Sequence, residues 1–291
     1  MSDYNADALP DLTNQTVIVT GGSSGIGQAA VAALASTGAH VVVAVRNTAK
    51  GETAIAGMPG SIEVRKLDLA DLASVRSFAE NWSGPVNVLI NNAGVSALSL
   101  QRTRDGFEMD FGTNHLGHFA LTCLLLPHVK DRIVTVASQA ERAARLDLND
   151  PNWEARPFRP SRAYNDSKLA NLLFTAELDR RLRADGSTVR AVAAHPGLVI
   201  TSIYDKPAGS PRSVWDRIVP ALGQDPAQGA LPLLFAATQD IPGNAFIGPQ
   251  HLLHMRGGAE SISRSATAKD PALAQRLWAL SEVLVGLPQQ T

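Results

Sequence analysis

The sequence of 291 residues contains a single cysteine, Cys123, so no disulfide can form within the chain. Charge of neither sign dominates, because 26 Lys and Arg residues against 27 Asp and Glu residues give a formal net charge of −1. This balance removes any general electrostatic reason to bind nucleic acid or an anionic membrane. Long apolar runs are missing too, since the longest, 119–126, ends at Pro127 and is too short to span a bilayer. The first residues are acidic and polar, unlike a secretory signal peptide. We therefore expect a cytoplasmic protein without a membrane span or a nucleic-acid partner.

Apolar runs of strand length alternate with amphipathic stretches of helical length along the chain. The expected strands end at Thr20, Val45, Asp68, Gly94, Ser138 and Gly197, and the longest expected helices cover 107–127 and 164–183. This alternation, without a repeat or a linker, predicts one α/β domain over residues 1–291. The expected fold is a single-domain Rossmann fold: a doubly wound parallel sheet of about seven strands with helices on both faces. Polar residues follow most strands, and ligands of such sheets bind at the carboxyl ends of the strands.

Two segments depart from this rhythm. Residues 201–227 mix prolines and glycines with large apolar side chains, which favours a small cover over the cleft that excludes water; a surface excursion without a role is the alternative. A C-terminal helix is expected around 271–286, because Asp270 and Pro271 form a good N-cap and N1 pair and leucines then recur at helical spacing.

The segment TVIVTGGSSGIG at Thr16–Gly27 joins a buried strand to a helix through a glycine-rich turn. Glycine permits positive φ and leaves no Cβ between the main chain and a ligand. The free N–H groups of the first helical turn favour a phosphate. The spacing G-x-x-x-G-x-G differs from the usual G-x-G-x-x-G but lies in the same strand–turn–helix context, so it predicts dinucleotide binding, with an ordinary glycine turn as the alternative.

Four further residues carry possible chemistry. Tyr164 and Lys168 lie at i and i+4 of a predicted helix, where an ammonium lowers the pKa of a nearby phenol and makes it a useful acid or base. Ser138 ends a predicted strand, where its hydroxyl can bind a substrate oxygen. Asn114 interrupts a predicted helix and indicates a local irregularity. Taken singly, each has an ordinary alternative: an exposed helical pair, a turn-forming serine and a solvated asparagine.

The combination, in this order, of TGGSSGIG, Asp68, NNAG, Asn114, Ser138, Tyr-x-x-x-Lys and Pro-Gly resembles the short-chain dehydrogenase/reductase family over about residues 12–250. TNHLGHF, YNDSKLANLLF and HPGLVITS are most similar to its retinol dehydrogenase-like and protochlorophyllide reductase-like branch. The resemblance implies hydride transfer between a nicotinamide and an alcohol or carbonyl carbon of a fairly apolar small molecule. It also implies that a homo-oligomer, a dimer or tetramer, can form through the helices at 107–127 and 164–183, although this branch includes monomers.

The resemblance also implies site residues. Tyr164 is the expected acid/base, Lys168 lowers its pKa and binds the nicotinamide ribose, Ser138 holds the substrate oxygen, and Asn114 positions a water. The expected cofactor contacts are Gly21, Ser23, Ser24, Gly25, Ile26 and Gly27 at the pyrophosphate and adenosine, Asp68 and Leu69 at adenine, Asn92, Ala93 and Gly94 along the cofactor, and Pro196, Gly197, Val199 and Thr201 at the carboxamide.

The end of the second predicted strand carries Arg46, where a carboxylate would bind the ribose hydroxyls of NAD. An arginine accommodates a 2′-phosphate, so NADP(H) is favoured over NAD(H). No metal site is expected, because the pairs His115/His118 and His251/His254 have no clear third ligand. The alternatives are a dinucleotide-binding regulator without catalysis, an NAD-dependent member of the same family, and a nucleotide-sugar epimerase or dehydratase. The hydrophobic N-terminal anchor of many retinol dehydrogenases is missing, which weakens a retinoid assignment.

Overall fold

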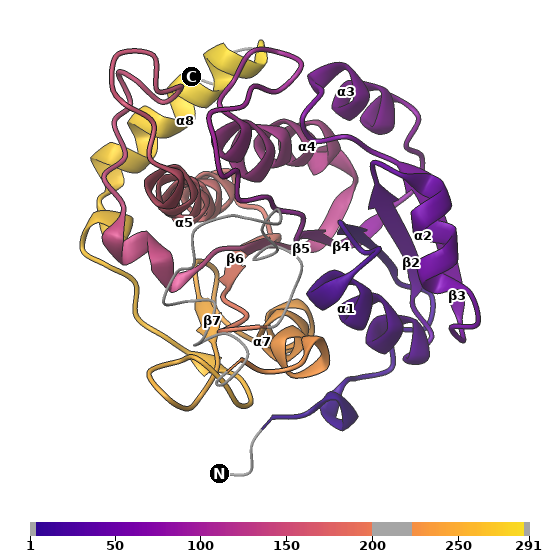
Figure 1. Ribbon diagram of the computed structural model, residues 1–291. Coiled ribbons are helices and arrows are strands. Elements are labelled where there is room, and N and C mark those ends of the chain that lie inside the picture. Colours follow the sequence, from indigo (N-terminus) through magenta and orange to yellow (C-terminus); the bar gives the residue numbers. More distant parts are fainter. Residues whose placement is uncertain (1–3, 200–222, 288–291) are drawn as a thin grey trace, which may run out of the picture.

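The computed structural model describes residues 4–199 and 223–287 and is built around one eight-stranded sheet (Figure 1). The strands are β1 (Thr16–Thr20), β2 (His40–Val45), β3 (Ser61–Lys66), β4 (Val86–Asn91), β5 (Val129–Val136), β6 (Arg190–Ala194), β7 (Phe246–Gly248) and β8 (Glu260–Ser261), in the spatial order β3-β2-β1-β4-β5-β6-β7-β8. All neighbours pair in parallel except β7 and β8. The predicted α/β fold is confirmed, and the strand count exceeds the expected seven because Glu260–Ser261 adds a short antiparallel edge.

Helices cover both faces of the sheet. They are α1 (Gly25–Ser36), α2 (Thr48–Ile55), α3 (Leu72–Glu80), α4 (Gly117–Leu125), α5 (Pro160–Ala184), α7 (Pro226–Thr238) and α8 (Pro271–Val285). In Figure 1, α3, α4, α5 and α8 lie on one side of the sheet and α1 and α7 on the other. Strand β1 feeds both layers, since Ile18 packs into the first and Val17 and Val19 into the second. This alternation follows from the pleat, which sends successive side chains to opposite faces.

The helix boundaries largely follow the expected signals. The carboxylate of Asp270 accepts hydrogen bonds from the N–H groups of Ala272 and Leu273, and α8 ends at Gly286 with a φ of 63°. The expected helix at 107–127 is present as a continuous helical segment that contains a π-helical turn, Phe111–Leu116, followed by α4 and a 3₁₀ turn. The tyrosine-bearing helix begins at Pro160, four residues before Tyr164, because proline suits the first turn.

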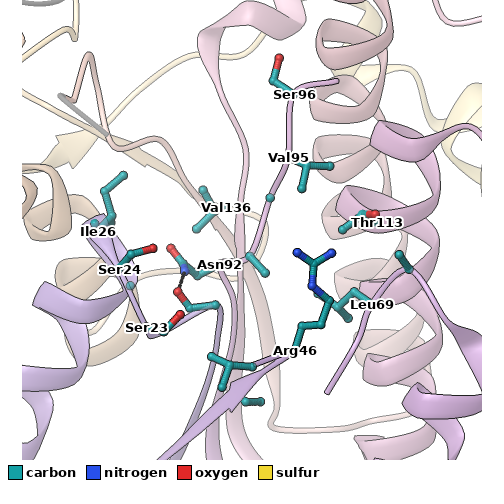
Figure 2. A pocket seen from close by; sticks show the side chains of 18 of the residues that line it. Ser23, Ser24, Ile26, Arg46, Leu69, Asn92, Val95, Ser96, Thr113 and Val136 are labelled. Atoms are coloured by element: carbon teal, nitrogen blue, oxygen red, sulfur yellow. Dashed lines mark hydrogen bonds between the residues drawn. The ribbon is translucent and has the colours of Figure 1, made fainter. Parts of the chain in front are cut away.

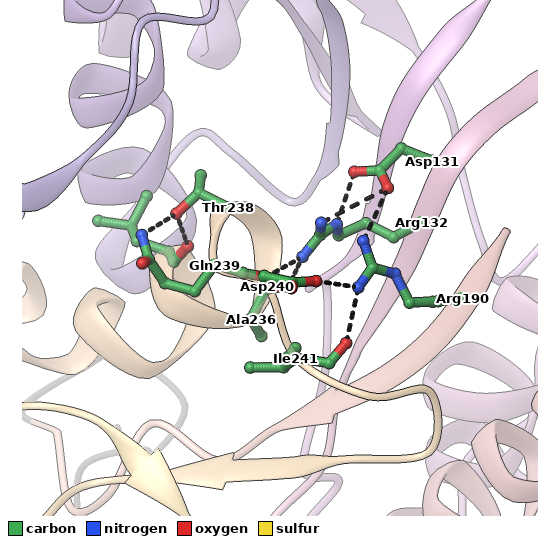
Figure 3. A network of polar contacts seen from close by, with 9 residues as sticks. Asp131, Arg132, Arg190, Ala236, Thr238, Gln239, Asp240 and Ile241 are labelled. Carbon is green, nitrogen blue, oxygen red and sulfur yellow. Dashed lines mark hydrogen bonds and ion pairs between the residues drawn. The ribbon is translucent and has the colours of Figure 1, made fainter. Parts of the chain in front are cut away.

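Arginines on two neighbouring strands attach the carboxyl end of α7 to the sheet (Figure 3). The buried guanidinium of Arg132 on β5 donates to the carbonyls of Ala236 and Gln239, at 3.1 and 2.7 Å. On β6, Arg190 donates to Asp240 at 2.7 Å. The last carbonyls of a helix have no partner within it, so Arg132 satisfies carbonyls at the end of α7, and Arg190 holds the segment that follows the helix.

Most of the predicted cover at 201–227 lies outside the described residues, and its last residues, Pro226 and Ala227, begin α7. Within 4–199 and 223–287, no helix combines the length and the apolar character that crossing a membrane requires.

Candidate active site

A cavity of about 570 Å³ opens at the carboxyl ends of the strands, where the strand order reverses between β1 and β4. Seventeen of the predicted cofactor contacts and Ser138 line it: Gly21, Ser23, Ser24, Gly25, Ile26, Gly27, Arg46, Asp68, Leu69, Asn92, Ala93, Gly94, Tyr164, Lys168, Pro196, Gly197 and Val199. The remaining one, Thr201, lies outside the described residues. Figure 2 shows the serines of the glycine turn on one wall and Arg46 and Leu69 on another.

The glycine turn is packed so closely that side chains cannot replace its hydrogens. A Cβ on Gly27 would lie 2.5 Å from the Asn92 Nδ2 atom and 2.6 Å from the backbone oxygen of Gly21, and Gly21 itself has a φ of 69°. At the N-cap of α1, Ser24 makes no side-chain hydrogen bond to the first turn. The first N–H groups of α1 therefore remain available at the cavity wall, which fits a pyrophosphate.

One buried hydroxyl, that of Thr20, joins the end of β1 to the NNAG segment after β4. Its Oγ1 atom accepts the N–H groups of Asn92 and Ala93, at 2.9 and 3.0 Å, and lies 2.9 Å from the His118 Nε2 atom. The other ring nitrogen of His118 lies 3.0 Å from the backbone carbonyl of Asn114. A carbonyl only accepts, so His118 Nδ1 carries the hydrogen and Nε2 accepts from Thr20.

Asn114 lies in the π-helical turn, which confirms the irregularity predicted there. Its amide donates to the Val95 carbonyl at 2.9 Å and to the Ser167 hydroxyl at 3.0 Å, and its Oδ1 atom accepts from the Val95 N–H at 2.8 Å. The side chain is therefore not solvated. It fixes the loop after β4 against the start of α5, and it lies just behind the cavity wall at Gly94.

Lys168 is buried rather than exposed, which excludes an exposed helical pair with Tyr164. Its Nζ atom donates to the Val136 carbonyl at 3.2 Å and lies 5.5 Å from the centre of the Tyr164 ring. Burial lowers the pKa of Lys168 to about 8, and the Asp110 charge opposes that effect. An ammonium this close to the phenol favours its ionised form.

Ser138 lies two residues beyond the end of β5 and caps a 3₁₀ turn, where its Oγ atom accepts the Ala140 N–H at 3.2 Å. That bond uses a lone pair and leaves the hydroxyl hydrogen for another acceptor. The serine thus combines the turn-forming position of the ordinary alternative with a place in the cavity wall beside Tyr164 and Lys168.

Several residues of this site were not predicted from the sequence. The cavity is also lined by Val95, Ser96, Met109 and Thr113. Thr20 contacts His118 and accepts the N–H groups of two lining residues, Asn92 and Ala93. No local pattern marks the first four, which come from a loop and from a helix edge that only the fold brings together. The histidines His115 and His118, for which the sequence offers no clear third metal ligand, are fully buried, and His118 uses both ring nitrogens in hydrogen bonds.

The family model of the short chain dehydrogenases matches residues 15–208. The chain belongs to this family. Human retinol dehydrogenase 13 is 38% identical over 95% of this chain and 86% of its own length. Human polyprenol dehydrogenase is 35% identical over 96% and 87%. A crystal structure of an uncharacterised protein from Mycobacterium paratuberculosis is 47% identical, covers 100% of both chains and has a TM-score of 0.88. The predicted retinol dehydrogenase-like branch is thereby confirmed, as is an alcohol-type oxidoreductase that uses a nicotinamide dinucleotide.

Proposed function

We propose that the protein is an NADP(H)-dependent oxidoreductase that reduces a carbonyl, or oxidises the corresponding alcohol, of a fairly apolar small molecule. The observation that carries the proposal is the position of Tyr164 and the buried Lys168 beside a glycine-lined cavity that accommodates a dinucleotide. The cofactor supplies the hydride; the chain supplies alignment and the proton.

In this proposal, Tyr164 donates its phenolic proton to the substrate oxygen during reduction and accepts it back during oxidation. Lys168 stabilises the phenolate form between turnovers, since its ammonium lies near the ring. Ser138 donates a hydrogen bond to the same substrate oxygen. Asn114 keeps the 94–97 loop in place and, as the family resemblance implies, positions a water that links Lys168 to solvent.

The preference for NADP(H) rests on Arg46, which follows β2 directly and lines the cavity. Within the described part of the chain, its guanidinium has no hydrogen-bond or ion-pair partner, so it is available to a 2′-phosphate. Lys50, in the first turn of α2, lines the same end of the cavity. In Figure 2, the Arg46 side chain lies beside Leu69 and points in among the residues that line the cavity.

An apolar substrate is supported by the relatives, which are named for retinol and polyprenol. It is also supported by Leu98 and Leu100, which follow the cavity residues Val95 and Ser96 and are 47% and 42% exposed. Exposed leucines that follow a cavity wall so closely in the sequence favour an apolar ligand.

The first test is fluorescence titration with NADPH and NADH, followed by turnover with decanal, all-trans-retinal and other apolar carbonyls. Tyr164→Phe keeps the ring and removes the proton, so we expect turnover to fall by about 10²–10⁴-fold with NADPH affinity changed only a few-fold. The matched control is Tyr4→Phe, the same change at a ring that packs on Phe235, outside the cavity. Retained turnover in Tyr164→Phe would exclude the assigned acid.

Arg46→Asp should shift the preference towards NADH, and an unchanged ratio of the two affinities would remove Arg46 from the cofactor site. Tighter binding of NADH than of NADPH by the wild type would favour the NAD-dependent alternative. Tight NADPH binding without turnover on the whole panel would favour the regulator. A cytoplasmic location belongs to this proposal and is tested by cell fractionation.

A homo-oligomer, a dimer or tetramer, belongs to the proposal, and light scattering measures the association state. Helix α8 packs along α5, with the Trp278 and Phe174 rings stacked 5.9 Å apart. The chain's own helix thus covers part of a face through which family members associate, and a dimer through α5 would have to use the remainder.

A further inference from the structure

Asp110 is a fully buried carboxyl group one helical turn before Asn114. Its Oδ1 atom accepts the Ala97 N–H at 2.8 Å, as Asn114 accepts that of Val95. The two side chains therefore hold the same loop, 94–97, whose residues Gly94, Val95 and Ser96 line the cavity. A Cβ built on Gly94 would lie 3.5 Å from the Lys168 Nζ atom, so the ammonium borders the same loop.

The second oxygen of Asp110, Oδ2, is buried and has no hydrogen-bond partner among the described residues. A bare carboxylate oxygen in such a place is costly unless it is protonated or faces a positive charge. Burial and the neighbouring Glu108 carboxylate raise the pKa of Asp110 to about 8, and the Lys168 charge opposes them.

The surroundings of the pair leave few other charges to consider. Asp110 faces Glu108 on its own side and Lys168 on α5, and Glu108 is in turn influenced by Arg102 and Asp166. The Lys168 charge also acts on His118 and His195, which burial keeps neutral by lowering their pKa values to about 4 and 3. Asp110 is thus the carboxyl group whose charge, once it ionises, raises the pKa of Lys168.

We propose that Asp110 is a positioning residue: its carboxyl group, buried behind the loop that Lys168 borders, sets through its charge the pH at which Lys168 is protonated. The proposal rests on the proposed function, in which the Lys168 charge controls Tyr164. It is independent of which carbonyl is reduced.

The coupling between the two groups is electrostatic, because no hydrogen bond or ion pair joins them among the described residues. The pKa values of Asp110 and Lys168 both lie at about 8, and interacting groups with similar pKa values titrate as a unit. A change of charge at Asp110 therefore shifts the titration of Lys168, and no proton needs to pass directly between them.

The test measures the titration of Lys168 in the full chain by ¹³Cε-lysine NMR. The Lys168→Met variant identifies the Lys168 resonance. Asp110→Asn keeps an oxygen for the Ala97 N–H and removes the negative charge that raises the Lys168 pKa. We expect its midpoint to fall by on the order of one pH unit. The alkaline limb of kcat/KM for NADPH-dependent carbonyl reduction should move down by a similar amount.

The variant Glu108→Gln should not lower the Lys168 midpoint as Asp110→Asn does. Removing the Glu108 charge lets Asp110 ionise at lower pH, which should hold the Lys168 midpoint at or above its wild-type value. A purely structural role predicts the same response from both variants, and so does a loss of fold, which melting curves report. Opposite responses support the proposal, and so does a downward shift in Asp110→Asn alone. If Asp110→Asn does not fold, an upward shift in Glu108→Gln supports it. A Lys168 midpoint unchanged within about 0.3 pH unit in every folded variant overturns it.

The NMR titration needs no turnover, so it separates this inference from the proposed function. If Tyr164→Phe retains activity while Asp110→Asn still moves the Lys168 midpoint, the proposed function fails and the coupling of Asp110 to Lys168 stands. If Tyr164→Phe is inactive and the midpoint does not move, the proposed function stands and this inference fails.

Discussion

Replacing the Thr20 hydroxyl by a methyl group, in Thr20→Val, tests the junction of β1 and β4 with almost no change of shape. Thr20 is fully buried, and its oxygen accepts the N–H groups of Asn92 and Ala93 and contacts His118 Nε2. The Asn92 N–H keeps a second acceptor, the Ile90 carbonyl at 3.0 Å. The substitution therefore leaves two groups without a partner, the Ala93 N–H and the His118 Nε2 atom.

Each unpaired buried polar group costs about 1–3 kcal/mol. Ala93 lies at the cavity wall and is only partly buried, so water recovers part of its loss. We therefore expect the free energy of unfolding to fall by about 2–4 kcal/mol, which for a chain of this length lowers Tm by roughly 4–8 °C. Because Asn92 and Ala93 line the cavity, NADPH affinity should also decrease.

The matched control is Thr175→Val, also fully buried, whose hydroxyl only donates to the Asn171 carbonyl one turn earlier in α5, at 2.8 Å. That carbonyl lies within reach of a backbone N–H of the helix, so its loss should be about 1 kcal/mol. Calorimetry and urea denaturation measure both variants. If Thr20→Val melts within about 1 °C of Thr175→Val, the assigned hydrogen-bond network is wrong.

Two further outcomes are expected. In Gly27→Ala, the new Cβ would lie 2.5 Å from Asn92 Nδ2, so NADPH affinity should fall about tenfold or more. The control Gly57→Ala, whose Cβ would have nothing within 4 Å, should leave the affinity unchanged. Equal NADPH affinities of the two variants would refute the close packing of the turn. Acid should destabilise the protein: burial lowers the pKa values of His115 and His195 to about 3 and of His118 to about 4, so the unfolded chain binds more protons than the folded one below pH ~6.5. Between pH 7 and pH 5, each of these rings should cost about 2 kcal/mol, partly offset by Asp110, whose raised pKa acts in the opposite direction. His195→Gln should lose about 2 kcal/mol less than the wild type in urea denaturation over this range, and an equal loss would show that His195 is not buried neutral.

Local patterns predicted the elements whose signals are short in sequence. The strand–glycine–helix unit at Thr16–Gly27 and the Asp270–Pro271 start of α8 depend on backbone sterics and on hydrogen bonds between near neighbours, so the residues themselves specify them. The same patterns predicted the helix at 107–127 and an irregularity at Asn114, but not the π-helical form of that irregularity, in which the Asn114 side chain contacts Val95 and Ser167, residues far away in the sequence.

By itself, the sequence determined the α/β alternation, the glycine turn and the order of the candidate residues from Gly21 to Val199, and this order was enough to indicate the family. Only the tertiary structure decided that Lys168 is buried beside Tyr164 and that Thr20 and His118 share a hydrogen bond. It also decided that Asp110 lies behind the loop that Asn114 holds. The physical reason is that burial, desolvation and charge coupling depend on which strands and helices meet, and these contacts join residues that no local spacing relates.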